Sequence, residues 1–338
     1  MSETLPVSVV IPAYGRPHLL RQALDSVFAQ TRAPSEVLVV DDGSEPPLEH
    51  VVSEYQARYV RRPNGGAGAA RNTGFRAASQ PWIAFLDSDD RWKPHKLERQ
   101  FAACEQCSDA DAVICDFLVT RDGAEWTTTA LEVHSSYQTI PRQALSGGAV
   151  RLRQPDAARA LCVANYLQPS TMLVRRSLLE RIGGFDERLR YCEDYDFGLR
   201  LFHLATPIAV DEPLVLYRSH DNGLSAREIE MRRGDLSVDE LIHAAPERYP
   251  LGACEVFAAK RPRKLIELAK GELLSGDYKA ARATLRKSLA ARPTPFAAAA
   301  LAFACIAPVW PQRLRRTALA IWTRRPWNVS PRWRRAQH

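Results

Sequence analysis

Three carboxylates in four positions follow a run of apolar residues, and this is the clearest chemical feature of the 338-residue sequence. The apolar run covers residues 82–86, and the carboxylates are Asp87, Asp89 and Asp90. A continuous apolar run that ends in charged residues is typical of a buried strand. Carboxylates this close raise one another's pKa unless a cation lies between them, and oxygen ligands suit Mg2+ or Mn2+. The stretch indicates a divalent-cation site at a strand end, with a helix or turn cap as the alternative.

The elements that must position these acids alternate between strand and helix. Continuous apolar runs predict strands at residues 7–11, 37–40, 59–60 and from residue 82, and helical spacing predicts helices at 17–30 and 48–55. A glycine loop at 64–68 leads into a helix of small residues that ends near residue 78. Such alternation predicts a mostly parallel sheet covered by helices on both faces.

The elements after residue 90 are less regular. We expect helices at 95–107 and 177–182, and strands at 112–117, 172–174, 208–210 and 214–217. Gly183 and Gly184 should end the second of these helices. Residues 118–165 show little periodicity, so we assign the substrate-contacting loops to them by elimination. The acids Glu193 and Asp194 predict a helix start, because the helix dipole stabilises negative charge there.

Six motifs, in their order and spacing, resemble the family 2 glycosyltransferases of the GT-A fold over residues 5–225. They are VVIPAY at 9–14, VVDDGS at 39–44, NGGAGAARNTG at 64–74, FLDSDD at 85–90, GFDE at 184–187 and EDYD at 193–196. The resemblance implies an α/β fold with a mostly parallel, Rossmann-like central sheet flanked by helices. It also implies a catalytic domain at 1–225, with residues 5–117 binding the nucleotide-sugar and residues 118–225 binding the acceptor.

The resemblance assigns a metal site to the acidic strand end. It implies that Asp89 is the main protein ligand of Mn2+ or Mg2+ and that Asp87 reaches the ribose or the water shell of the metal. Asp90 then either supports the site or caps the turn. His220 matches a position from which a histidine contacts the metal or the diphosphate, and an ordinary loop histidine is the alternative.

A nucleotide site next to the metal is also implied. Asp42 holds the nucleobase in this assignment, although a turn residue before Gly43 is the alternative. Arg71 is expected to meet the diphosphate as a charged donor. The full set of implied nucleotide-binding residues is Pro12, Ala13, Tyr14, Asp42, Arg71, Asp87 and Ser88.

The remaining acids receive the proton-transfer role. An acceptor hydroxyl must lose its proton as it attacks the sugar, and a carboxylate within hydrogen-bond reach can act as the general base. The resemblance implies that Asp194 is this base, that Glu193 orients it or touches the acceptor, and that the reaction inverts the anomeric configuration. A helix-start pair without catalytic function is the alternative.

The charge of the chain is unevenly distributed. Thirteen Lys and Arg and no acid follow Asp277, so a total charge of +7 leaves residues 1–277 at −6. Residues 226–295 are expected to form an α-helical extension with a hairpin at 265–274 and 278–290. Residues 296–338 form an apolar and basic tail whose apolar part, at 296–310, is too short to span a bilayer. Two interpretations stay open: the tail lies in an anionic membrane interface, or it is a buried helix with a solvated basic end.

The expected location is the cytoplasm or the cytoplasmic face of a membrane. The seven cysteines have no framework spacing, which favours reduced thiols, and no signal peptide is visible. The acidic body disfavours nucleic acid as a partner.

The resemblance implies an inverting, metal-dependent enzyme that moves a sugar from a nucleotide-sugar, with a UDP-sugar favoured, to a hydroxyl of a saccharide or lipid-linked acceptor. Synthesis of a cell-surface polysaccharide or glycoconjugate is the expected context. The alternatives are a sugar nucleotidyltransferase and a catalytically silent nucleotide-sugar-binding module. Nucleotidyltransferases carry a glycine-rich loop with an arginine directly after the first strand, whereas this chain has PAYGRP at 12–17.

Overall fold

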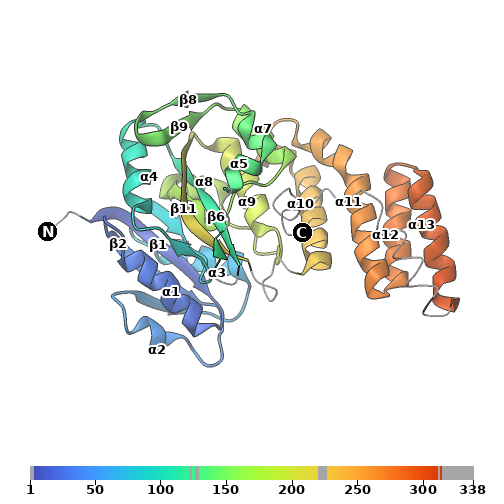
Figure 1. The fold of residues 1–338 in the computed structure, drawn as a ribbon, viewed down its shortest axis with the longest axis horizontal. Helices are drawn as coiled ribbons and strands as arrows, with labels where there is room; N and C mark the ends of the chain where they lie inside the picture. Colours follow the sequence, from blue (N-terminus) through green and yellow to red (C-terminus); the bar gives the residue numbers. More distant parts are fainter. Residues whose placement is uncertain (1–3, 122–123, 126–128, 220–226, 311–312, 314–338) are drawn as a thin grey trace. The chain divides into compact units, whose positions relative to one another are not determined.

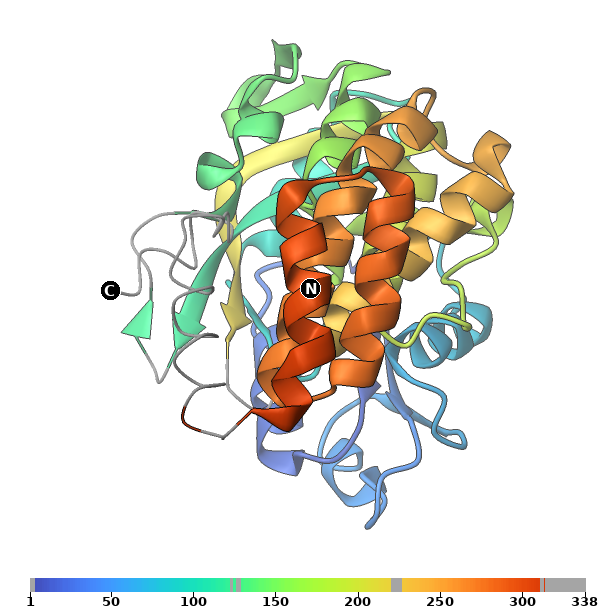
Figure 2. The same cartoon turned by 90° about the vertical axis from the view of Figure 1, so that its right-hand side faces the viewer.

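The computed structural model describes residues 4–121, 124–125, 129–219, 227–310 and 313, and the chain forms two compact units (Figure 1, Figure 2). The first unit comprises residues 1–221 together with the short segment 247–251. The second unit comprises residues 222–246 and 252–338. His220, which the sequence suggests as a metal contact, lies outside the described residues.

The first unit is built on one sheet whose strands follow the order β3-β2-β1-β4-β10-β6-β11-β9-β8. Strands β3, β2, β1 and β4 are parallel, as the sequence predicts. Beyond them the sheet is mixed, because β10 runs antiparallel between β4 and β6. The strands on this path are β1 (Leu5–Ala13), β2 (Pro34–Asp41), β3 (Arg58–Arg61), β4 (Trp82–Phe85), β6 (Ala112–Arg121), β8 (Arg142–Ala144), β9 (Ala149–Leu152), β10 (Leu173–Arg175) and β11 (Pro207–Arg218). The short strands β5 (Arg91–Trp92) and β7 (Ala124–Glu125) pair with β11 and β6.

Helices cover both faces of the parallel strands. Because side chains alternate along a strand, Val9 and Val10 lie on opposite faces. Val9 belongs to a core that also contains residues of α1 (Pro17–Phe28), α2 (Glu49–Val52) and α4 (Lys96–Glu105). Val10 faces α3 (Ala67–Ala77), where a Cβ on Gly74 would lie 2.3 Å from its Cγ1. The glycine therefore lets α3 lie directly on the sheet.

The expectation of loops at residues 118–165 is wrong for much of that range. Strand β6 continues to Arg121, and the β8–β9 hairpin extends the sheet beyond β11. The short strand β9 buries its end residues Ala149 and Leu152, a pattern too brief to be recognised by periodicity. The helices here are α5 (Ala130–Val133), α6 (Ser135–Gln138) and α7 (Asp156–Val163).

The later motifs follow helix α8 and begin helix α9. Helix α8 (Arg176–Ile182) ends at Gly183, whose φ of +78° matches the predicted stop. Helix α9 (Glu193–Leu204) begins at the predicted acidic pair. The two runs expected at 208–210 and 214–217 form the single strand β11, whose register shifts around Pro213.

The second unit is an array of four helices within the described residues: α10 (Glu228–Ala244), α11 (Ala253–Ser275), α12 (Tyr278–Ala291) and α13 (Pro295–Ile306). Helices α11 and α12 form the expected hairpin, and Asp277 caps α12 by accepting a hydrogen bond from the amide of Ala280 at 2.9 Å. One face of α13 packs into the core of this unit through Ala297, Ala300 and Ala304. Across the described parts of the chain, we find no helix that combines the length and apolar character needed to cross a membrane.

Candidate active site

The predicted nucleotide residues meet at one edge of the sheet, because the parallel strands β1, β2 and β4 end there. The amide of Asp42 donates to the carbonyl of Ala13 at 2.8 Å, which joins the ends of β2 and β1. Tyr14 follows with 61% of its surface exposed, so its ring is available at the edge. Pro12 is the last residue but one of β1, and Asp87 and Ser88 lie just beyond β4.

Arg71 joins two acidic groups that are far apart in the sequence. Its Nη2 donates to Oδ1 of Asp87 at 2.6 Å, and its Nη1 donates to Oε1 of Glu193 at 3.0 Å. The guanidinium is buried and lies 5.1 Å from the centre of the Phe185 ring. Its Nε is also buried and has no hydrogen-bond partner among the described residues. The strand end and the start of α9 are therefore held together by one side chain.

Asp194 lies at the start of α9, next to Glu193. Burial, followed by the charge of Glu193, raises the pKa of Asp194 to about 7, although Arg71 opposes both effects. The preceding residue, Cys192, has a φ of +60°, a conformation that non-glycine residues adopt rarely. A carboxyl group with a pKa near neutrality can accept a proton at physiological pH.

The buried carboxylate of Asp90 stabilises the turn after β4. Its carboxylate accepts hydrogen bonds from the hydroxyl of Ser170 at 2.6 Å and from the amide of Arg218 at 2.9 Å. The same Ser170 hydroxyl accepts a hydrogen bond from the amide of Asp87 at 3.0 Å. Burial, together with the charges of Asp89 and Asp87, raises the pKa of Asp90 well above its ordinary value. Asp90 thus stabilises the turn after β4, and the choice between its two expected roles stays a prediction.

Asp89 points to a different partner. Its Oδ2 lies 3.1 Å from Nη1 of Arg16, and both side chains are partly exposed. No group of three or more His, Cys, Asp or Glu side chains able to hold a metal occurs among the described residues. The partly exposed carboxylates of Asp87 and Asp89 nevertheless follow the same strand, and these oxygen donors suit a divalent cation whose other ligands are phosphate and water. The residues present therefore fit a metal site with few protein ligands.

Asp42 holds the glycine loop that leads into α3. Its carboxylate accepts hydrogen bonds from the amides of Gly65 at 3.0 Å and Gly66 at 2.7 Å, and lies 3.3 Å from Nη1 of Arg62. Asp42 is thus engaged within the protein at the expected edge of the sheet. Its assignment to the nucleobase stays a prediction.

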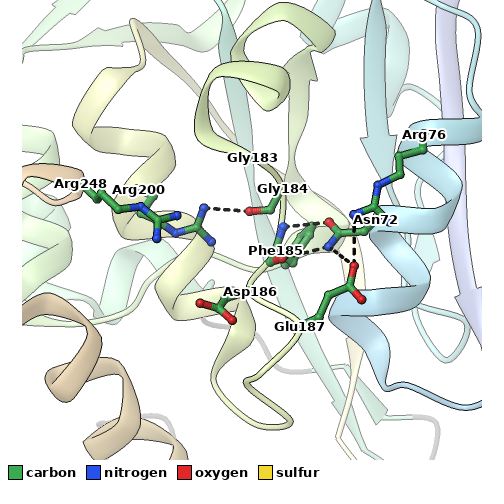
Figure 3. A pocket seen from close by; sticks show the side chains of 9 residues that line it. All are labelled: Asn72, Arg76, Gly183, Gly184, Phe185, Asp186, Glu187, Arg200 and Arg248. Carbon is green, nitrogen blue, oxygen red and sulfur yellow. Dashed lines mark hydrogen bonds and ion pairs between the residues drawn. The ribbon is translucent and has the colours of Figure 1, made fainter. Parts of the chain in front are cut away.

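A separate pocket lies on the loop between α8 and α9 (Figure 3). The side chain of Asn72 holds this loop, because its Oδ1 accepts from the amide of Phe185 and its Nδ2 donates to the carbonyl of the same residue. Arg200 donates to the carbonyl of Gly184 from the other side, as the dashed line in Figure 3 shows. The lining residues are Asn72, Arg76, Gly183, Gly184, Phe185, Asp186, Glu187, Arg200 and Arg248. The predicted catalytic carboxylates are not among them.

The sequence model of the family described as "Glycosyl transferase family 2" matches residues 8–183, more than half of the chain. The chain belongs to this family. Relatives in family 2 include an uncharacterized glycosyltransferase of Rickettsia prowazekii, 29% identical over 63% of this chain and 64% of the relative. EpsJ of Bacillus subtilis, also an uncharacterized glycosyltransferase, is 29% identical over 65% of this chain and 62% of its own length. The chain thus spans somewhat less than two thirds of these relatives.

Solved structures share the GT-A architecture. S. aureus TarS 1-349 in complex with UDP-GlcNAc has a TM-score of 0.59 and 19% identity, with 87% of this chain and 83% of that chain covered. The mannosyltransferase PcManGT from Pyrobaculum calidifontis, in complex with GDP-Man and Mn2+, has a TM-score of 0.51 and 18% identity, with 94% and 84% covered. At this identity the likeness establishes the fold: a large central sheet flanked by helices, as predicted.

Several residues of the site were not recognised in the sequence. Arg16, Ser170 and Arg218 contact the acids after β4 from three distant segments. Ser170 lies in the short 3-10 helix Pro169–Thr171 and carries no local signal of this role. Arg16 carries one weak signal, since it stands between Gly15 and a proline that begins α1.

Proposed function

We propose that this family 2 protein is an inverting glycosyltransferase that moves a sugar from a nucleotide-sugar to a hydroxyl group. The observation that supports the proposal is the bridge from Asp87 through Arg71 to Glu193, because Asp87 belongs to the predicted donor site and Glu193 precedes the predicted base. In this proposal residues 1–225 are the catalytic domain, and a saccharide or lipid-linked acceptor approaches beside the start of α9.

The proposed reaction is a single displacement. The acceptor oxygen bonds to the anomeric carbon as its proton passes to the carboxylate of Asp194, and the bond from that carbon to the nucleoside diphosphate breaks, leaving the electron pair on the diphosphate. The pKa of Asp194, raised to about 7 mainly by burial, supports its role as the base. Glu193 is already paired with Arg71, so it orients the base instead of taking the proton.

The donor side of the proposal rests on Arg71, Asp87 and Asp89. The buried Nε of Arg71 lacks a hydrogen-bond partner among the described residues, and a diphosphate oxygen would satisfy it. Asp89, with Asp87, would hold Mn2+ or Mg2+, which when bound supplies positive charge to the leaving diphosphate. Pro12, Ala13, Tyr14, Asp42 and Ser88 are proposed to surround the nucleoside.

The similar structures support a nucleotide-sugar as the donor. The TarS structure contains UDP-GlcNAc and the mannosyltransferase structure contains GDP-Man, so both carry a sugar on a nucleoside diphosphate. We favour a UDP-sugar for this chain, used in the synthesis of a cell-surface polysaccharide or glycoconjugate.

The test is a panel of UDP- and GDP-sugars, measured by thermal shift with Mn2+ and again with a chelator. One donor class should raise the melting temperature in a metal-dependent way, and the same donor should be cleaved to nucleoside diphosphate. Asp194→Asn is the matched control, because it should bind the donor as the wild type does but not transfer the sugar. Absence of any donor-dependent shift would contradict the proposal, and a shift without turnover in the wild type would favour a silent binding module.

We further propose that the C-terminal tail, residues 296–338, places the enzyme on the cytoplasmic face of an anionic membrane, where a lipid-linked acceptor is found. Residues 311–338 contain eight arginines and three tryptophans and no acid, a composition that suits a membrane interface. The test deletes residues 311–338, which keeps every residue of α13. The deletion should lower binding to vesicles that contain anionic lipid, and high salt should do the same to the full chain. Equal binding by both proteins would refute membrane docking.

A further inference from the structure

The segment between α10 and α11 contributes a buried tyrosine to the first unit. Residues 247–251 belong to that unit, although the residues before and after them belong to the second. Tyr249 is only 2% exposed, and its hydroxyl donates a 2.6 Å hydrogen bond to Oδ1 of Asp196. Burial and the charge of Asp196 raise the pKa of Tyr249, so the hydroxyl keeps its proton and acts as the donor.

Asp196 is fully buried and is shared between two donors. Its Oδ2 accepts from Nε of Arg200 at 2.9 Å and also from Nη2 of the same side chain. Among the described residues, Tyr249 is the donor that satisfies Oδ1. A buried carboxylate oxygen that loses its donor is costly, so the Tyr249 hydroxyl constrains where Asp196 can lie.

The position of Asp196 determines the position of the proposed base. Asp196 lies in the first turn of α9, two residues after Asp194, and its amide donates to the carbonyl of Cys192 at 3.1 Å. Cys192 is the residue with positive φ immediately before Glu193. The hydrogen bonds of Asp196 therefore hold both sides of the Glu193-Asp194 pair.

Arg200, which is paired with Asp196, also holds the loop between α8 and α9. Nη1 of Arg200 donates to the carbonyl of Ile182 at 2.9 Å. It also donates to the carbonyl of Gly184 at 2.8 Å (Figure 3). Phe185 of this loop stacks on Phe197 of α9, with ring centres 3.9 Å apart. The Phe185 ring in turn lies beneath Arg71. A shift of Asp196 would thus move the start of α9 and, with it, the base.

We propose that Tyr249 is a positioning residue that holds the start of α9, and with it Asp194, in the geometry for proton transfer. This inference rests on the proposed function for its catalytic consequence. The mechanical part, that Tyr249 holds the first turn of α9, stands on the contacts alone. Tyr249 lies far beyond residues 8–183, which the family model matches.

The experiment compares Tyr249→Phe with Tyr55→Phe in the full chain. Tyr55 provides a matched control, because its hydroxyl also donates to an aspartate, Asp25, at 2.7 Å, but between α1 and the segment after α2. Small displacements of a catalytic group cost on the order of 100-fold in rate, so Y249F should lower kcat by about 10-fold or more. The donor KM and the affinity for the nucleoside diphosphate should stay within twofold, and Y55F should leave kcat unchanged. An unchanged kcat in Y249F, or equal losses in both variants, would overturn the proposal.

Hydrogen exchange provides a second readout that needs no turnover. Amides of residues 194–200 should exchange at least tenfold faster in Y249F than in the wild type, whereas amides of α3 should not change. Unchanged exchange in α9 would overturn the positioning role even if the rate fell. If the wild type transfers no sugar, the proposed function fails, but the exchange result still decides whether Tyr249 holds α9. If Y249F does not fold, the wild type alone is informative, because first-turn amides of α9 that exchange as fast as a frayed helix end would refute the anchor.

Discussion

The sharpest test of the site is the removal of Arg71. Arg71→Met keeps an unbranched side chain in the buried space but leaves Asp87 and Glu193 without their shared cation. Removing one partner of a buried ion pair typically destabilises a protein by about 3–5 kcal/mol, because the remaining charge is uncompensated. At about 2–4 °C per kcal/mol for a domain of this size, the melting temperature of the first unit should fall by roughly 6–20 °C.

Helix α3 provides the control. Arg76→Gln removes an arginine five positions later in the same helix, but Arg76 is 65% exposed and pairs with an exposed Glu187. Exposed ion pairs contribute about 0–1 kcal/mol, so R76Q should shift the melting temperature by no more than about 4 °C. The double variant R71M/E193Q removes one of the two uncompensated charges and should therefore regain part of the stability lost in R71M, without regaining transfer activity.

The pH dependence offers a second readout of the same change. Arg71 lowers the pKa of Asp194, so R71M should move the acidic limb of the kcat profile to higher pH. Thermal melts of the four proteins and a pH series of initial rates are sufficient. A fall of less than about 6 °C in the melting temperature of R71M would refute the claim that Arg71 is the buried tie between the strand end and α9.

Three further predictions follow from single side chains. Asp194→Asn should lower kcat by about 10²–10⁴-fold with donor binding retained. Wild-type activity should fall as the pH drops below the Asp194 pKa of about 7. A variant that keeps more than a tenth of wild-type activity would show that Asp194 is not the base. Burial lowers the pKa of Lys96 to about 8 from an ordinary 10.5, so between these pH values the unfolded chain binds more protons and stability should rise with pH. Urea midpoints at pH 7.5 and 10 should show this rise as the difference between the wild type and Lys96→Met, and an equal pH response in both would contradict it. Gly74→Ala should destabilise the first unit by about 1–3 kcal/mol in urea melts, because the new Cβ meets Val10 at 2.3 Å; a neutral effect would mean that α3 can move away from the sheet.

Local sequence patterns were sufficient to predict the strand and the helix that carry the acidic residues. Strand β4 and the turn with Asp87 and Asp89 follow from an apolar run that stops at charges, and the start of α9 follows from the acids at 193 and 194. The end of α8 follows from Gly183. These features are encoded within a few neighbouring residues, because strand burial, helix dipoles and left-handed glycines act over short stretches of chain.

Local pattern was insufficient where an element depends on a distant partner. Strand β8 is only three residues long and is stabilised by pairing with β9. Strand β9 is likewise stabilised by antiparallel pairing with β11. Sheet pairing between segments far apart in the chain leaves little periodic trace in such short runs, so the sequence predicted loops where the sheet continues.

By itself, the sequence determined which residues could do the chemistry: the acids after β4, the acids that begin α9, and the arginine of α3. The tertiary structure decided how they are used, since it pairs Arg71 with Glu193 across 122 positions and Ser170 with Asp90 across 80. In the tertiary structure Asp42 also accepts a hydrogen bond from the amide of Gly66 in the glycine loop, and the Tyr249 hydroxyl donates to Asp196. Hydrogen bonds and ion pairs of this kind depend on distances between side chains, and those distances are set only when the strands and helices pack around a common core.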